Sequence, residues 1–172
     1  MISNIQVKGM DKVLQGMSNL GKELSNPKQP LENSGSYMQQ EALKNFPAKG
    51  SVMQEGGWPQ LAKPEWRTSA KGKRYWFPGT QAIKKAKGYG GQPMMVRTGD
   101  LRDSFKKSEP RIGANISSID VLNPVSYAIE HQLGIGKNLP RRTLLKFRAN
   151  HRKKITDIFI EWIVKSTQKS FK

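Results

Sequence analysis

Residues 47–97 are interrupted by glycine and proline so often that no apolar period of a helix or a strand survives there. A loop of this length is uncommon inside a compact domain and is usually functional or disordered. The stretch nevertheless holds six aromatic side chains, whereas disordered segments are poor in aromatic residues. We therefore expect an extended basic and aromatic arm that becomes ordered against something else, such as another subunit.

The residues before this arm predict two helices. The first has one apolar face, which packs either on this domain or on a neighbouring subunit, and it ends at Asn26-Pro27 because a residue before proline avoids the helical region. Its face consists of Met10, Val13, Leu14, Met17, Leu20 and Leu24. The second helix is expected to start near Ser36, which has capping-box spacing to Gln39, and to stop at Pro47. Residues 2–7 could form a short edge strand.

The residues after the arm predict a helix, strands and a last helix. Thr98 is a candidate N-cap of a short helix that ends near Ser108. Residues 111–114 and 116–122 favour two strands joined near Asn115, and residues 142–147 a third strand. The final helix shows one apolar face, formed by Ile155, Ile158, Phe159, Trp162 and Ile163.

This order of elements predicts an α+β fold. We expect one domain over residues 1–172, in which a small antiparallel sheet is packed by N- and C-terminal helices and a long central arm projects. Its parts are the N-terminal helices (1–46), the arm (47–97), and the helix, sheet and C-terminal helix (98–172).

The charge of the chain favours acidic partners. Lys and Arg number 30 against 13 Asp and Glu, a formal net charge of +17. Most of the excess lies in residues 56–111 and 137–172, each with net +9, while residues 112–136 carry net −2. Such a balance suits polyanions or acidic protein surfaces. The absence of cysteine excludes disulfides and thiolate metal sites. We expect no secretory signal, no bilayer-spanning segment and no membrane partner.

Candidate catalytic residues are few. His131 lies beside Glu130, but consecutive residues point in different directions on a helix. No HExxH spacing, phosphate-binding loop or nucleophile elbow accompanies them. We expect a structural role for His131 and Gln132, as hydrogen-bonding anchors of a packed turn. We also expect no catalytic residue, cofactor or metal. An enzymatic role for His131 is the weaker hypothesis.

Two basic patches indicate a nucleic-acid alternative. Lys71, Lys73 and Arg74 precede the aromatic run Tyr75–Phe77, and cations beside aromatic rings suit phosphates and unpaired bases. The second patch consists of Arg148, Arg152, Lys153 and Lys154. No recognised nucleic-acid-binding motif is visible, so a solvated surface or a face that docks on an acidic protein explains these patches equally well.

Four motifs, in order, carry a resemblance to a known family. They lie in residues 57–61, 97–104, 127–134 and 140–145, and correspond to a tryptophan with a following leucine, "TG-L--S", "YA--HQ-G" and "PR--L". The matching residues are Trp58, Leu61, Thr98, Gly99, Leu101, Ser104, Tyr127, Ala128, His131, Gln132, Gly134, Pro140 and Arg141. The chain resembles the Mu-type phage virion morphogenesis family, also called tail completion or head–tail joining proteins.

The resemblance implies a structural role without enzymatic activity. Such a protein acts at the head–tail junction, or neck, of a tailed phage or prophage and assembles as a homo-oligomeric ring around the DNA channel. Its partners would be a portal, an adaptor or a tail terminator, with non-specific contact to DNA. It would lie in the virion at the junction or tail end, and in the host cytoplasm during assembly. The insert between Leu61 and Thr98 is longer than the family pattern, and the two N-terminal helices lie outside the resemblance.

Overall fold

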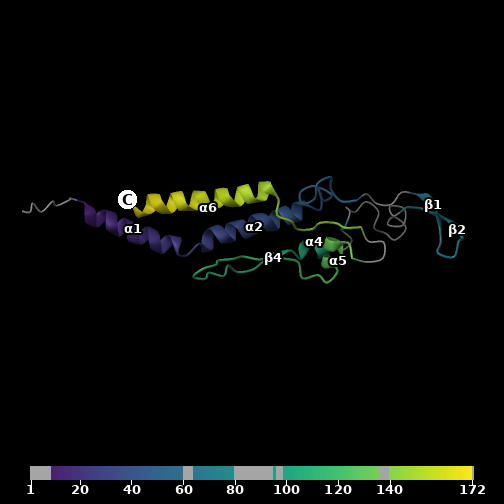
Figure 1. Ribbon diagram of the computed structural model, residues 1–172, viewed down its shortest axis with the longest axis horizontal. Coiled ribbons are helices and arrows are strands. Elements are labelled where there is room, and N and C mark those ends of the chain that lie inside the picture. The colour runs from purple at the N-terminus through teal and green to yellow at the C-terminus, as the bar shows by residue number, and fades with distance from the viewer. Residues whose placement is uncertain (1–8, 60–63, 80–94, 96–98, 136–139, 172) are drawn as a thin grey trace, which may run out of the picture. The chain divides into compact units, whose positions relative to one another are not determined.

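The structure, a computed structural model, describes residues 9–59, 64–79, 95, 99–135 and 140–171. Within these residues the chain has five helices and two antiparallel pairs of short strands (Figure 1). The predicted α+β fold is therefore confirmed. The edge strand expected at residues 2–7 lies outside the described residues. The chain groups into two compact units, and each is built from separate stretches of sequence.

The first unit contains residues 1–38, 107–121 and 148–172. Helices α1 (Met10–Leu24) and α6 (Ala149–Ser170) pack against each other in it, together with the first part of α2 (Lys28–Lys44). Gly16 of α1 is buried, and a Cβ atom added there would lie 2.7 Å from the Phe171 ring. Lys169 Nζ reaches Glu23 Oε1 at 2.5 Å. The two helices thus approach closely where α1 has no side chain.

The start of α2 differs from the prediction. The helix begins at Lys28, so Ser36 lies in its interior and caps nothing. The Pro27 carbonyl accepts the Leu31 amide at 3.2 Å, and proline at position 30 is tolerated because it falls in the first turn, where amides lack helical partners. The helix ends at Lys44, before Pro47.

The predicted C-terminal helix is confirmed as α6, and His151 anchors its start. The Nδ1 atom of His151 accepts the main-chain amide of Arg148 at 3.3 Å. The ring is fully buried and meets Tyr37 edge-on, with 6.1 Å between ring centroids. A histidine therefore does tie down a helix end in this chain, although the sequence analysis assigned that kind of task to His131.

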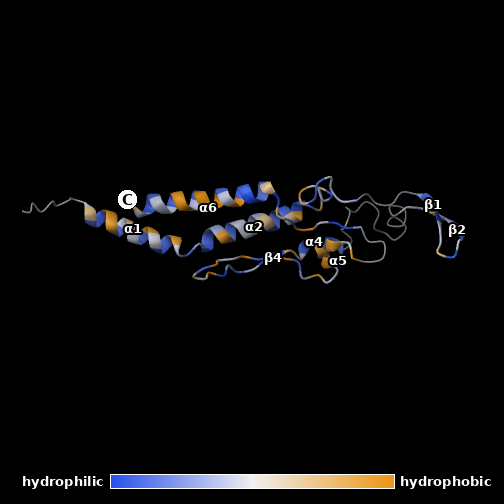
Figure 2. Ribbon diagram, viewed as in Figure 1, coloured by the Kyte–Doolittle hydropathy of each residue, from blue (hydrophilic) through white to orange (hydrophobic). Residues whose placement is uncertain are grey.

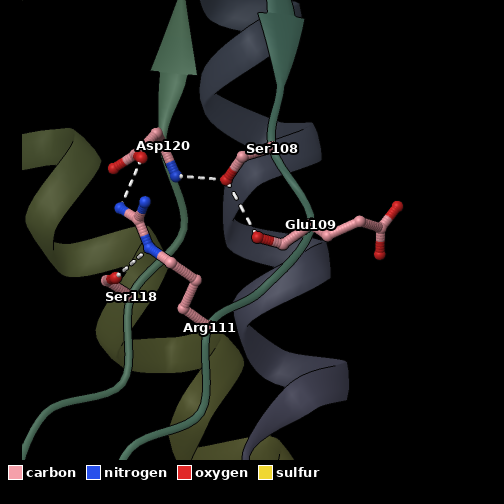
Figure 3. Close-up of polar contacts among 5 residues, drawn as sticks. All are labelled: Ser108, Glu109, Arg111, Ser118 and Asp120. Atoms are coloured by element: carbon pink, nitrogen blue, oxygen red, sulfur yellow. Dashed lines mark hydrogen bonds and ion pairs between the residues drawn. The ribbon is translucent and has the colours of Figure 1, made fainter.

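A hairpin over residues 107–121 completes the first unit, and it confirms the predicted pair of strands with different bounds. Strand β3 (Lys106–Lys107) pairs with β4 (Val121–Leu122), and farther along Arg111 bridges Ser118. Figure 3 shows the polar contacts between the two arms: Ser108 Oγ accepts the Asp120 amide at 3.0 Å, and the Arg111 guanidinium meets the Asp120 carboxylate at 2.5 Å. Ile119 packs on Gly35 of α2, so the hairpin lies against a helix.

The second unit contains residues 39–106 and 122–147. It holds the end of α2 and two short helices, α4 (Asp100–Asp103) and α5 (Ala128–Leu133). Its core is aromatic: the Phe46 ring meets Trp58 and Phe105 edge-on, with centroids 5.4 Å and 6.2 Å apart. Both Phe46 and Phe105 are buried.

The expected arm at residues 47–97 contains local structure that its glycine and proline content does not predict. Residues 45–58 fold into successive turns that bury Met53 and Trp58. Strands β1 (Glu65–Thr68) and β2 (Arg74–Phe77) then form an antiparallel hairpin in which Trp66 pairs with Trp76. Residues 60–63, 80–94 and 96–98 lie outside the described part of the chain.

Two further predictions need correction. The helix expected from Thr98 to Ser108 spans only Asp100–Asp103 and has Gly99, with φ +97°, at its N-cap. The third strand expected at residues 142–147 is absent from this described segment, because its main-chain groups are bonded by side chains rather than by a neighbouring strand.

Candidate functional site

The turns after α2 place the side chains of Asn45 and Trp58. Asn45 is fully buried, and its Oδ1 accepts the Met53 amide at 3.1 Å, which closes the turn between them. Gly50 adopts φ +90°, and a Cβ atom there would overlap the Trp58 indole. The Trp58 amide donates to the Lys49 carbonyl at 2.6 Å. Glycine at position 50 therefore lets the indole fold back over the turn.

The main chain of Thr143 is where these side chains meet. Its carbonyl oxygen accepts Trp58 Nε1 at 2.9 Å and Asn45 Nδ2 at 2.9 Å. Its amide donates to Gln54 Oε1 at 3.0 Å. An unpaired buried peptide group costs free energy comparable to a lost hydrogen bond, so these three side chains replace the missing strand. The residues around this point, Asn45–Trp58 and Arg141–Leu145 with α5, are called the motif scaffold below.

Gln132 of α5 fastens the same segment two residues farther on. Its Oε1 accepts the amides of Leu144 at 2.7 Å and Leu145 at 3.1 Å, while its Nε2 donates to the Leu145 carbonyl at 2.9 Å. One amide side chain thus satisfies three main-chain groups. Gln132 fits its expected role as a hydrogen-bonding anchor, although it lies on a helix rather than in a turn.

Gly134 ends α5 and permits a close approach of the chain. It adopts φ +71°, and its amide donates to the Glu130 carbonyl at 2.8 Å, as in a left-handed helix cap. A Cβ atom at this position would lie 2.9 Å from the Arg141 amide nitrogen. Glycine is therefore needed both for the backbone angle and for the passage of the following segment.

His131 is half-buried, and its ring is not the anchor that the sequence analysis expected. Its main-chain carbonyl accepts the Arg142 amide at 2.7 Å, but the buried Nδ1 has no hydrogen-bond partner among the described residues. The ring meets Tyr127 edge-on at 6.1 Å. Burial lowers the pKa of His131 below its ordinary 6.5, Arg142 lowers it further, and Glu130 opposes the shift. Burial and the Arg142 charge thus favour the neutral form of the ring.

The remaining motif residues pack around these contacts. Leu101 is buried, and its carbonyl accepts Asn123 Nδ2 at 2.6 Å. Ala128 is buried, Ser104 caps the end of α4, and Tyr127 and Arg141 are exposed. Pro140 is half-buried. Leu61 and Thr98 lie outside the described residues.

An open, mostly apolar pocket of about 290 Å³ lies beside α5. The motif residues Ala128 and Gln132 form part of its wall, and the Gln132 amide is already bonded to the main chain. Its lining consists of Phe105, Asn123, Ala128, Ile129, Gln132, Leu144 and Leu145. The pocket offers shape and apolar contact, which suits an apolar side chain of a neighbouring molecule.

The basic and aromatic patches lie in different units. Lys71, Lys73 and Arg74 are exposed in the turn and second strand of the β1–β2 hairpin. The Arg74 guanidinium lies 5.5 Å from the Trp66 ring, and the Trp66 and Trp76 rings meet edge-on at 5.5 Å. The other patch falls at the start of α6, where Arg152, Lys153 and Lys154 are exposed and Arg148 is half-buried. Each patch is therefore a separate surface feature of its own unit.

The described ranges lack two other kinds of feature. They contain no group of three His, Asp or Glu side chains placed to share a metal ion. None of their helices is both long and apolar enough to cross a bilayer.

Sequence analysis missed Asn45, Gln54 and Thr143. Asn45 follows Met38 and Ala42 at helical spacing, which puts a polar side chain on the buried face of α2. That conflict was the one available signal, since a buried amide needs partners. Gln54 and Thr143 carry no comparable pattern, because their partner is a stretch of backbone far away in the sequence.

Comparisons of the chain with protein-family models, curated proteins and solved structures find no match.

Proposed function

We propose that this protein is a structural component of a tailed phage or prophage particle and acts at the head–tail junction. The observation that carries the proposal is the convergence of motif segments in the motif scaffold. Trp58 and Gln132 come from two motifs of the resemblance, and residues 140–145 from a third. The side chains of Trp58 and Gln132 form hydrogen bonds with the main chain of this third segment. These hydrogen bonds fix the conformation of the chain, and a structural component of an assembly needs a fixed surface.

The outer surface of the motif scaffold supports the same role. The pocket beside α5 is open and mostly apolar, and Ile129 and Leu133 of that helix are exposed. An exposed apolar pocket with a few polar groups is typical of contact with another molecule. In the proposed particle that molecule is another subunit of the ring or a neighbouring portal, adaptor or tail terminator. The role assigns no reaction and no cofactor to the chain.

Negative-stain imaging of the purified full chain tests the proposal. We expect closed rings with a central channel, because a heterologous contact repeated around an axis closes into a ring. A matched pair of variants makes the test sharper: Ile129→Asp places a charge at the apolar pocket, whereas Glu109→Gln changes an exposed residue of the hairpin. Rings lost only with Ile129→Asp support the proposal. A strictly monomeric wild-type protein at high concentration, with no ring in assembled particles, contradicts it.

A second candidate function, nucleic-acid binding, is favoured by the β1–β2 hairpin. Its register places Trp66, Trp76 and Arg74 on one face, since side chains alternate along a strand. Both indoles are exposed and the guanidinium is beside one of them, so bases and phosphates could be contacted together. The opposite face holds Arg67, which is already paired with Glu65 at 2.6 Å and lies over Phe77.

Titration with a labelled thymidine oligonucleotide at several salt concentrations tests this candidate. Neutralising Lys73, Arg74, Arg152 and Lys153 to glutamine is expected to weaken binding and to flatten its salt dependence, because fewer counterions are released. Affinity that stays the same in this variant excludes the candidate.

A further inference from the structure

Helix α1 carries an apolar stripe with the spacing of a coiled-coil seam. Successive steps along the stripe are three, four, three and four residues, the alternation that brings a and d positions to one side of a helix. Leu14 widens the stripe at a flanking position. The seam positions are Met10, Val13, Met17, Leu20 and Leu24. Such a stripe packs against another helix with a similar stripe.

The contact that α1 makes within its own unit uses a different side of the helix. Gly16 is its one buried residue, and it faces Phe171 and Ser170 of the C-terminal end. Glu23, seven residues on and therefore on the same side, reaches Lys169. Most of the stripe remains open: the exposed fractions of Met10, Val13, Leu14, Met17 and Leu24 run from 39% to 60%, whereas Leu20 is half-buried.

Helix α6 carries a second open stripe. Its buried side holds His151, Trp162 and Ser166, of which Trp162 is half-buried. The opposite side is also apolar around residues 160–164. Figure 2 shows hydrophobic residues, in orange, recurring along both α1 and α6. Three large side chains there are 43–53% exposed: Ile160, Ile163 and Val164. A helix that is apolar on two sides is normally covered on both.

A second copy of this chain fits both stripes at once. If α1 of one copy lies along the outer side of α6 of the next, a single repeated contact covers both stripes in every copy. Pairing of α1 with α1 would cover only one of them and leave the α6 stripe in water. Contiguous apolar patches of this extent are rare on monomers and mark interaction sites.

We propose that α1 packs along the outer face of α6 of a neighbouring copy, with Met17 opposite the region of Ile163. Because the two surfaces differ, the contact is head-to-tail and propagates to a ring or a filament. The closed ring rests on the proposed function, whereas the α1–α6 contact follows from the two open stripes.

The chain has no cysteine of its own, so introduced cysteines can form disulfides only with each other in a cross-linking test. Two single variants of the full chain, Met17→Cys and Ile163→Cys, are mixed and oxidised with diamide, and disulfide-linked dimers are counted on a non-reducing gel. We expect at least tenfold more dimer in the mixture than in either variant alone. Both sites are exposed, so the folded state should tolerate the changes.

Trp66→Cys mixed with Met17→Cys is the matched control. Trp66 is more exposed than Ile163, so disulfides formed in this mixture measure random collision. A mixture that links no better than this control overturns the proposal, as does linking of Met17→Cys with itself in preference to Ile163→Cys. Imaging separates the two proposals: rings without the Met17–Ile163 link overturn only the contact, and the link without rings overturns only the ring function.

Discussion

Trp58 and Trp66 are eight residues apart in one glycine-rich stretch, yet 4% of Trp58 and 61% of Trp66 is exposed. Trp58 has a carbonyl for its indole nitrogen and the Phe46 ring against its face. Trp66 meets Trp76 and the Arg74 guanidinium on one face of a two-stranded ribbon, and such a ribbon is too thin to bury a large ring. The same residue type therefore builds the motif scaffold in one place and is presented to the surroundings in the other.

The difference extends to the whole molecule. In the motif scaffold, polar side chains such as Asn45 and Gln132 are used to bond main chain, and apolar rings fill the space between. Along α1 and the β1–β2 hairpin, large apolar side chains face outward without polar partners. Stability and recognition are thus assigned to different regions, and substitutions should separate them.

Replacing each tryptophan by alanine should give the largest contrast. We expect Trp58→Ala to lower the free energy of unfolding by about 3–5 kcal/mol, because it leaves a cavity and removes a bond to the Thr143 carbonyl. Trp66→Ala should cost less than about 1 kcal/mol, since the contacts that are lost, with the Trp76 ring and the Arg74 guanidinium, are exposed to solvent. Urea unfolding followed by circular dichroism measures both. Equal costs would contradict the assignment of the two rings.

Two glycines in the same turn region sharpen the comparison. Gly50 and Gly56 both have positive φ, of +90° and +73°. Gly50→Ala should cost about 2–4 kcal/mol, because the new methyl overlaps the Trp58 indole in addition to straining the backbone. Gly56→Ala should cost about 1 kcal/mol, as nothing lies near its Cβ position. Thermal unfolding of the two variants should show the larger drop for Gly50→Ala, and the reverse order would refute the packing described here.

Gln132 tests whether main-chain bonding by side chains holds the scaffold. Gln132→Leu should lower the unfolding free energy by about 2–3 kcal/mol, because the amides of Leu144 and Leu145 lose their acceptor. Gln132→Glu keeps the acceptor for these amides but replaces the donor to the Leu145 carbonyl by a charged oxygen, so its cost should arise at that carbonyl. A leucine variant as stable as the wild type would show that solvent or another group satisfies these amides.

The smallest expected effect is a pH dependence from His131. Burial and Arg142 lower its pKa below 6.5 in the folded state, so the unfolded chain binds a proton first as the pH falls. Stability should therefore decline from pH 6.5 downward until the lowered pKa of the folded state is passed. Unfolding of wild type and His131→Gln at pH 7.5 and 5.0 measures this, and the variant should lose less stability on acidification. Identical losses would exclude a contribution from His131.

Local periodicity explains what could be predicted from the sequence. The helices at Met10–Leu24 and Ala149–Ser170 follow from apolar spacings of three and four residues, and the 107–121 hairpin from alternation. The capping-box spacing of Ser36 and Gln39 predicts a start eight residues too late, because Pro30 is tolerated in the first turn of a helix that begins at Lys28. A local sequence pattern does not show whether a strand has a neighbour to pair with. The strand predicted at residues 142–147 is therefore wrong.

The candidate site was predictable only in part for a related reason. Gln132 was identified through its motif, but its acceptor and donor partners were not. The bonds that join Asn45, Gln54 and Trp58 to Thr143 span 98, 89 and 85 residues of sequence. Such distant partners leave no local pattern. The apolar face of α1 was predicted, while the fact that its own unit leaves the face open required the structure.

Sedimentation velocity of the full chain over a wide concentration range tests most directly the claim that α1 is kept open for assembly. The wild type should form oligomers, and their mass should increase with protein concentration. Leu14→Asp/Met17→Asp should sediment as a single chain with an unchanged circular dichroism spectrum, because both side chains are exposed. Trp66→Ala should behave as the wild type. A wild-type protein that remains a single chain at every concentration would contradict the account.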